Sequence, residues 1–262
     1  MKYTLADDAR PQVKLLLVAT VATVVLWFIP YAEFLVYPIR LFVTFIHESS
    51  HALVALVTGG SVQSLTIAAD GSGVVYSVPS GLFGALFTSS AGYLGTMFFG
   101  VLMLWLMRRN TSPQKILFVS GAFVGVMTIV FGILAPVFNF LSVQVGFSSV
   151  AFTVVVGLLL AVGLIAMSLY ASRRVAEFAV AFLAVQCLLN ALSDLKTVLF
   201  ASAPLIGSDI QTDAANMQTA TGIPGFLWVI IWIVISLGFM ALGVRMYTAV
   251  KTVGTGDSVF ED

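Results

Sequence analysis

The sequence predicts an all-α polytopic membrane protein with about seven transmembrane helices and a small β-hairpin after the second of them. Of the 262 residues, 60% are hydrophobic and 9% are charged, whereas a soluble domain carries about 25% charged residues. Several apolar runs reach the length of about 20 residues that a helix needs to cross roughly 30 Å of hydrocarbon. Basic and acidic residues balance at 12 each, so no basic excess indicates a nucleic-acid partner.

The first two apolar runs follow a polar N-terminus, residues 1–14. The first run extends from Leu15 to about Val36, and we expect Pro30 and Pro38 to bend it or to divide it from the next. The second run, residues 39–57, contains both histidines of the chain. It ends at Thr58-Gly59-Gly60, because glycine tolerates the left-handed conformation that terminates helices.

A hairpin and five further apolar runs complete the predicted domain. Two β-prone segments, residues 62–67 and 74–78, flank a turn that contains Asp70-Gly71-Ser72-Gly73, which is typical of a hairpin. Residues 201–225 are predicted to form a long loop, and residues 252–262 a polar tail. We expect a single membrane-embedded domain over residues 1–262. The five runs are Leu82–Met107, Ile116–Leu141, Phe147–Tyr170, Val175–Phe200 and Phe226–Val250.

The second run carries the motif H-E-x-x-H, from His47 to His51. Residues four apart on a helix share a face, so both imidazoles can bind one metal while Glu48 reaches a water on it. The metal lowers the pKa of that water, and Glu48 can accept its proton during attack on a carbonyl. A charged residue in an apolar run is costly unless it is paired or hydrated. The pattern predicts zinc bound by His47 and His51; the alternative is a helix-packing trio hydrogen-bonded to neighbouring backbone.

A zinc site of this kind needs a third protein ligand. We favour Asp194, because it lies in an otherwise apolar run where a metal would neutralise a costly carboxylate. Its alternative roles are an ion pair with Lys196 or contact with the membrane interface. Asp213, in a polar stretch, is the alternative ligand, and its competing interpretation is a helix cap or turn residue.

Together these features resemble the site-2 protease class of intramembrane zinc metallopeptidases, and most closely its B-like branch. The resemblance spans roughly residues 40–235. It implies a membrane-embedded zinc metalloprotease that hydrolyses peptide bonds in or near transmembrane segments, with a transmembrane protein as substrate and membrane lipids around it. We expect an integral multi-pass protein of a bacterial plasma membrane. The matching strings are His47 to Leu53, Thr58-Gly59-Gly60, Gly71-Ser72-Gly73, Ala91 to Gly95, and Thr221 to Pro224 with Trp228.

When the family's functional residues are matched to this sequence, the resemblance implies that His47, His51 and Asp194 are zinc ligands and that Glu48 is the general base. Gln186 stands eight residues before Asp194, where better-known members carry asparagine, which implies contact with substrate. Besides Gln186, two details depart from the family pattern. Leu195 follows Asp194 where the family has glycine, and Tyr93 follows Gly92 where proline is usual.

The predicted hairpin suits a protease that works within the membrane. A helical substrate hides its carbonyls in backbone hydrogen bonds, and an exposed strand edge can pair with the unwound chain. Gly71 and Gly73 would then bind substrate by allowing close backbone approach, or would simply form a tight turn. Two other functions remain open: a non-proteolytic protein with a structural or regulatory zinc site, and a lipid or acyl hydrolase that uses the same zinc chemistry.

Overall fold

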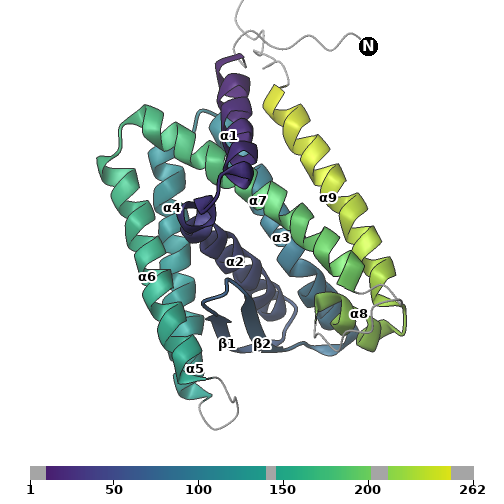
Figure 1. Cartoon of the computed structure of the whole chain (residues 1–262). Helices are drawn as coiled ribbons and strands as arrows, with labels where there is room; N and C mark the ends of the chain where they lie inside the picture. The colour runs from purple at the N-terminus through teal and green to yellow at the C-terminus, as the bar shows by residue number, and fades with distance from the viewer. Residues whose placement is uncertain (1–9, 140–145, 202–211, 249–262) are drawn as a thin grey trace, which may run out of the picture.

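The protein is a bundle of helices with one two-stranded sheet (Figure 1). This computed structural model describes residues 10–139, 146–201 and 212–248. It confirms the all-α class and the small hairpin. The strands are β1 (Ser61–Ile67) and β2 (Gly73–Val78), and a π-helix, η2 (Thr128–Leu134), continues α4. The α-helices are α1 (Arg10–Phe28), α2 (Ala32–Val57), α3 (Gly81–Arg108), α4 (Pro113–Met127), α5 (Ala135–Phe138), α6 (Phe147–Tyr170), α7 (Arg173–Ala201), α8 (Asp213–Thr221) and α9 (Gly225–Thr248).

Five segments within the described ranges are long and apolar enough to cross a membrane, so the protein is an integral multi-pass membrane protein. The expected count of about seven is not confirmed. The apolar part of α1, Val13–Leu26, would span only about 21 Å. Helix α2 is long but carries Arg40, Glu48 and both histidines. The five spans are Gly81–Arg108, Pro113–Phe138, Phe147–Tyr170, Arg173–Phe200 and Gly225–Tyr247.

The first predicted run is divided rather than bent. Helix α1 ends at Phe28, and Tyr31 then adopts a left-handed conformation with φ of 63° before α2 begins at Ala32. Pro30 lies in this connection, where its ring and missing N–H do not interrupt a helix. Pro38 stays inside α2, so the helix with the histidines begins before the predicted residue 39.

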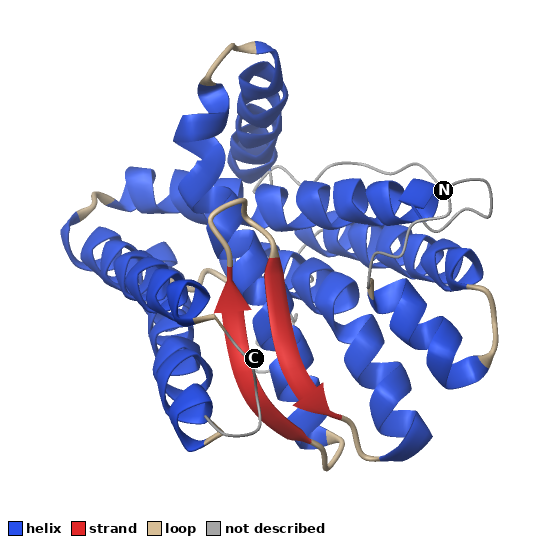
Figure 2. Ribbon diagram, turned by 60° about the horizontal axis from the view of Figure 1, so that its bottom comes forward, coloured by secondary structure: helices blue, strands red, loops and turns tan. Residues whose placement is uncertain are grey.

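The hairpin is attached to helices on both sides. Strands β1 and β2 pair antiparallel from Ser61 opposite Val78 to Ile67 opposite Gly73. At the end of β1, the buried Ile67 N–H donates to Thr153 Oγ1 of α6 at 2.7 Å. Strand β2 pairs only with β1 among the described residues, and Figure 2 shows the sheet as a ribbon surrounded by helices. One edge of β2 is therefore unpaired.

Helix α3 packs closely on its neighbours through glycine. A Cβ atom added at Gly95 would overlap the hydroxyl of Ser50 on α2. A Cβ atom at Gly100 would lie 2.9 Å from the carbonyl oxygen of Ala184 on α7. Small residues allow such close approach between helices in membranes. The packing of α3 therefore holds α2 and α7, which carry the predicted site residues, near each other.

The predicted late loop contains a helix, α8. Thr212 caps α8, because its hydroxyl accepts a hydrogen bond from the Ala215 N–H at 3.2 Å, and Gly222 ends the helix with φ of 73°. Asp213 thus occupies the first turn of α8. Residues 202–211 of the predicted loop, the first nine residues of the predicted N-terminus and all of the predicted polar tail lie outside the described residues.

Candidate metal centre

Three side chains from two helices converge on one point. His47 and His51 lie one turn apart on α2, and Asp213 reaches them from the first turn of α8. Asp213 Oδ2 is 3.4 Å from His47 Nε2 and 3.3 Å from His51 Nε2. All three potential ligand atoms lie within 4.8 Å of one another. The predicted histidine pair is therefore brought together with a carboxylate.

The two distances from Asp213 to the imidazoles suit a zinc ion. Two ligands that bind tetrahedral zinc at about 2.0–2.1 Å are separated from each other by about 3.3 Å. The two nitrogen to oxygen separations, 3.3 and 3.4 Å, agree with that value. Two imidazoles and one carboxylate also match the donor set of catalytic zinc sites, which keep a fourth position open.

The surroundings fix the orientation of both imidazoles. His51 Nδ1 lies 2.6 Å from the carbonyl oxygen of Thr88 on α3. A carbonyl only accepts, so Nδ1 carries a proton, and Nε2, which faces Asp213, is the nitrogen available to a metal. The ring of Tyr93 meets His47 edge to face at 4.7 Å, and Tyr93 itself packs on Trp232 at 5.5 Å. Both rings are thus held before any metal binds.

Two glycines, Gly92 and Gly73, lie so close to the site that any side chain at either residue would overlap it. A Cβ atom at Gly92 would overlap Nε2 of both histidines. A Cβ atom at Gly73 would lie 2.5 Å from Cγ of Glu48 and 2.6 Å from its carboxyl Oε1. The close approach that the sequence predicts at Gly73 is thus an approach to Glu48. Contact of Gly71 or Gly73 with a substrate stays a prediction.

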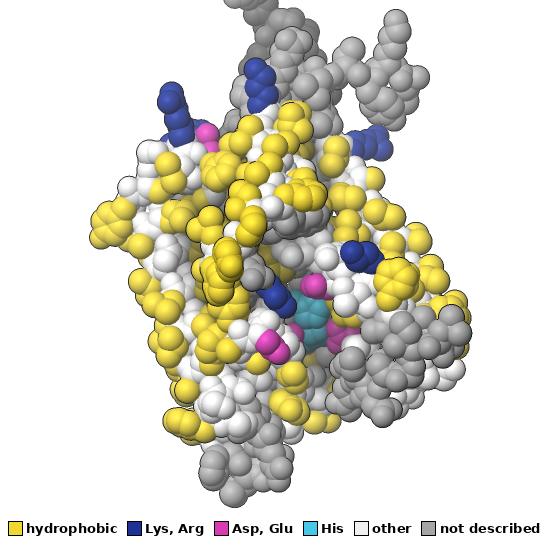
Figure 3. Space-filling model, in the orientation of Figure 1, with side chains coloured by type: hydrophobic (Ala, Val, Ile, Leu, Met, Phe, Trp, Pro, Cys, Tyr) yellow, Lys and Arg dark blue, Asp and Glu magenta, His cyan; other side chains and the backbone are white. Residues whose placement is uncertain are grey.

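A cavity of about 270 Å³ lies beside the cluster. In Figure 3 it is a hollow in which histidine surface is visible, with acidic and basic side chains around it. Glu48 is 6% exposed and faces this cavity from α2. The site therefore combines a candidate metal centre, a carboxylate and room for a ligand. The lining residues are Arg40, Val43, Thr44, His47, Glu48, Gly71, Ser72, Gly73, Tyr93, Asn190, Asp194, Thr197 and Val198.

Asp194, the favoured third ligand, is not the carboxylate that meets the histidines. It lines the same cavity from α7, but the group that could hold a metal contains Asp213 instead. The side chain of Asp194 is exposed towards the cavity, and a ligand role for it stays a prediction. Asp213 was the alternative, and its competing role as a cap is taken by Thr212.

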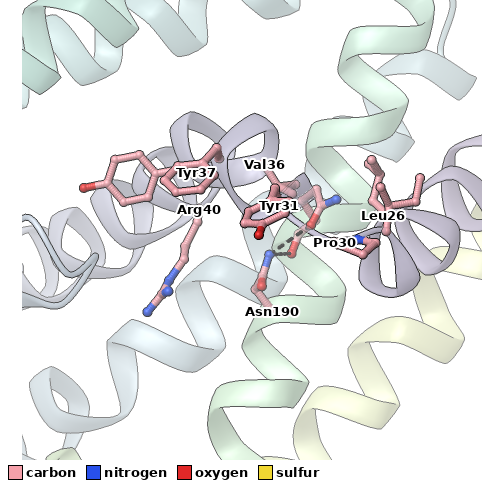
Figure 4. Close-up of a pocket in the computed structure, with 10 residues that line it drawn as sticks. Leu26, Pro30, Tyr31, Val36, Tyr37, Arg40 and Asn190 are labelled. Atoms are coloured by element: carbon pink, nitrogen blue, oxygen red, sulfur yellow. Dashed lines mark hydrogen bonds between the residues drawn. The ribbon is translucent and has the colours of Figure 1, made fainter.

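Gln186 lies away from the metal cavity. Its side chain is 3% exposed, donates to Thr23 Oγ1 of α1 at 3.1 Å and accepts from Asn190 Nδ2 at 3.1 Å. It lines a second cavity of about 600 Å³, between α7 and the connection of α1 to α2 (Figure 4). A substrate role for Gln186 stays a prediction. Asn190, which the sequence analysis did not single out, lines both cavities.

The fold and this cluster define a multi-pass membrane protein with a candidate metal centre of two histidines and one aspartate. The chain belongs to the Peptidase M50B-like family, whose model matches residues 16–243. This match confirms the resemblance to the B-like branch of the site-2 protease class. Comparisons with curated proteins and with solved structures found no match.

Proposed function

We propose that this protein is a zinc-dependent intramembrane peptidase that hydrolyses peptide bonds in or near transmembrane segments. The observation that carries the proposal is the position of Asp213 Oδ2, 3.3 and 3.4 Å from two imidazole nitrogens, beside a glutamate that faces a cavity. Membership of a peptidase family supports the reaction class. The five apolar spans support a substrate that lies in the membrane.

The residues of the cluster divide into metal ligands, a general base and a residue that orients one ligand. His47, His51 and Asp213 would hold the ion, and zinc would supply the Lewis acidity that activates water and polarises the scissile carbonyl. Glu48 accepts a proton from the attacking water and passes it to the leaving amine. Thr88 keeps His51 in the tautomer that presents Nε2.

Strand β2 is suited to bind the substrate. A transmembrane helix must unwind before its carbonyls can be attacked, because they are engaged in backbone hydrogen bonds. The edge of β2 that pairs with no strand of the described residues can bind such an extended chain, and Gly73 at its start lies against Glu48. An added strand would thus run past the general base.

The competing function, a structural or regulatory zinc site, has less support. Structural zinc sites are closed, with four protein ligands, whereas catalytic sites keep an open position. Among the residues described here, three groups converge and a cavity lies next to them. An open fourth position beside a buried glutamate favours catalysis.

The proposal is tested by comparing wild type with Glu48→Gln in detergent or nanodiscs. We expect both proteins to bind one zinc ion, measured by elemental analysis. We expect cleavage of a single-span substrate to fall by a factor of about 10² to 10⁴ in the variant, the range for loss of general acid–base catalysis. Equal cleavage by the two proteins, or wild type that binds no zinc, contradicts the proposal.

A further inference from the structure

Arg40 lines both cavities. It stands seven residues before His47 on α2, which places it on the same face and about 10 Å along the helix axis. Its exposed side chain lines the metal cavity and also the larger cavity, and Figure 4 shows it extending from α2 away from Pro30 and Tyr31. The guanidinium is therefore in reach of a chain bound in either cavity.

The charge of Arg40 is unpaired within the described part of the chain. Asp70 and Asp194 are close enough to interact with it electrostatically, but neither forms an ion pair with it. Asp70 instead accepts hydrogen bonds from the backbone and hydroxyl of Ser72, at 2.9 and 2.7 Å. These bonds hold the pKa of Asp70 below its ordinary value. Arginine among apolar helices marks a functional site by default.

The turn of the hairpin supports the guanidinium. Gly71 has φ of 85°, and a Cβ atom at that residue would lie 2.9 Å from Arg40 Nε. The turn is fastened to α2 by Thr44, whose hydroxyl donates to the Gly71 carbonyl at 2.9 Å. Tyr37 likewise donates to the carbonyl of Ala69 at 2.5 Å. The contact with Gly71 therefore restrains Arg40 where it faces both cavities.

We propose that Arg40 is a specificity residue that binds a carboxylate of the peptide substrate about three residues from the cleaved bond. The spacing follows from the offset of about 10 Å between Arg40 and His47 and the rise of about 3.3 Å per residue in an extended chain. The planar guanidinium binds carboxylate through two parallel hydrogen bonds. The carboxylate can belong to a glutamate or aspartate side chain or to a free C-terminus. This role rests on the proposed peptidase function.

The first experiment measures the position of cleavage. The probes are single-span peptides of leucine and alanine with a central glycine pair, in which one glutamate is moved along the sequence. We expect mass spectrometry of the products to show a cut that moves with the glutamate, about three residues from it. Arg40→Gln should lose this register, whereas Lys115→Gln, which removes an exposed cation that lines neither cavity, should keep it. Cleavage at positions independent of the glutamate overturns the proposal.

The second experiment measures binding without cleavage, in the Glu48→Gln protein. Peptides with glutamate should bind about tenfold to a hundredfold more tightly than peptides with glutamine, as expected for a charge-assisted hydrogen bond. A double variant that carries Arg40→Glu as well as Glu48→Gln should instead bind a lysine peptide more tightly than a glutamate peptide. A purely structural role for Arg40 would not reverse the preference in this way. Equal affinities for the glutamate and glutamine peptides overturn the proposal.

Two further comparisons identify the carboxylate that Arg40 binds and distinguish the proposed peptidase function from the proposed role of Arg40. Amidated peptides with an internal glutamate, and peptides whose only carboxylate is the free C-terminus, show which carboxylate Arg40 binds. If no peptide is cleaved but the glutamate preference in binding persists, the proposed function fails and the binding role of Arg40 stands. If peptides are cleaved without regard to glutamate, only the role of Arg40 fails.

Discussion

Asp213 Oδ2 lies 3.3 Å from Nε2 of His51, although the two residues belong to α8 and α2, which are far apart in the sequence. Helix α8 is held near α2 by its own packing, because Ala214 and Met217 are buried in a cluster with Tyr93 and Trp232. Tyr93 in turn contacts His47. The same packing therefore completes the metal centre and stabilises this end of the bundle.

Replacement of Gly92 by alanine should abolish metal binding. A Cβ atom at this residue overlaps the ligand nitrogens of His47 and His51, so α3 or the imidazoles must move. We expect zinc content to fall below one tenth of the wild-type value in elemental analysis. Gly163→Ala is the matched control, because a Cβ atom there meets nothing within 4 Å. Full zinc content in Gly92→Ala would show that the close packing of α3 on the histidines is wrong.

Replacement of Gly73 by alanine should separate catalysis from metal binding. The added Cβ atom would lie only 2.5 to 2.8 Å from Cγ, Cδ and Oε1 of Glu48 and would displace the general base. We expect peptide cleavage to fall at least about tenfold, with zinc content unchanged because no ligand is touched. Cleavage at the wild-type rate would contradict this prediction, because it would show that Glu48 does not lie against Gly73 during catalysis.

The contact of the hairpin with α6 should contribute measurably to stability. Thr153→Val leaves the buried Ile67 N–H without the acceptor that it has at 2.7 Å, and an unsatisfied buried donor costs about 1–3 kcal/mol. We expect a lower midpoint in thermal unfolding for Thr153→Val. Thr153→Ser keeps the hydroxyl and should restore most of the loss. Equal midpoints for the valine variant and wild type would contradict this role.

Features that depend on residues close together in the sequence were predicted well. The hairpin, the glycines that end α2 and the histidines four residues apart all follow from local backbone preference or helical period. The later apolar runs also match helices, because length and hydrophobicity suffice to define them. The first two runs did not follow this rule. Their division depends on the turn at Tyr31, and the charged face of α2 makes it less apolar than a typical span.

Features that depend on packing between distant segments were not predicted. Helix α8 has little apolar character, so only its capping residues, Thr212 and Gly222, distinguish it from a loop in the sequence. Asp194 lies in an apolar helix, and only the packing of α7 shows that its side chain lines the cavity beside His47. Arg40 and Asn190 gain their positions only when α2 and α7 pack together, and no spacing in the sequence reveals that contact.

The zinc content of two aspartate variants tests the central claim most directly. Purified Asp213→Ala and Asp194→Ala would be supplied with one equivalent of zinc, dialysed and analysed beside wild type. We expect Asp213→Ala to lose at least about nine tenths of the metal, because a ligand is removed, and Asp194→Ala to retain one zinc ion per chain. Zinc lost from Asp194→Ala but kept by Asp213→Ala would contradict the metal centre described here.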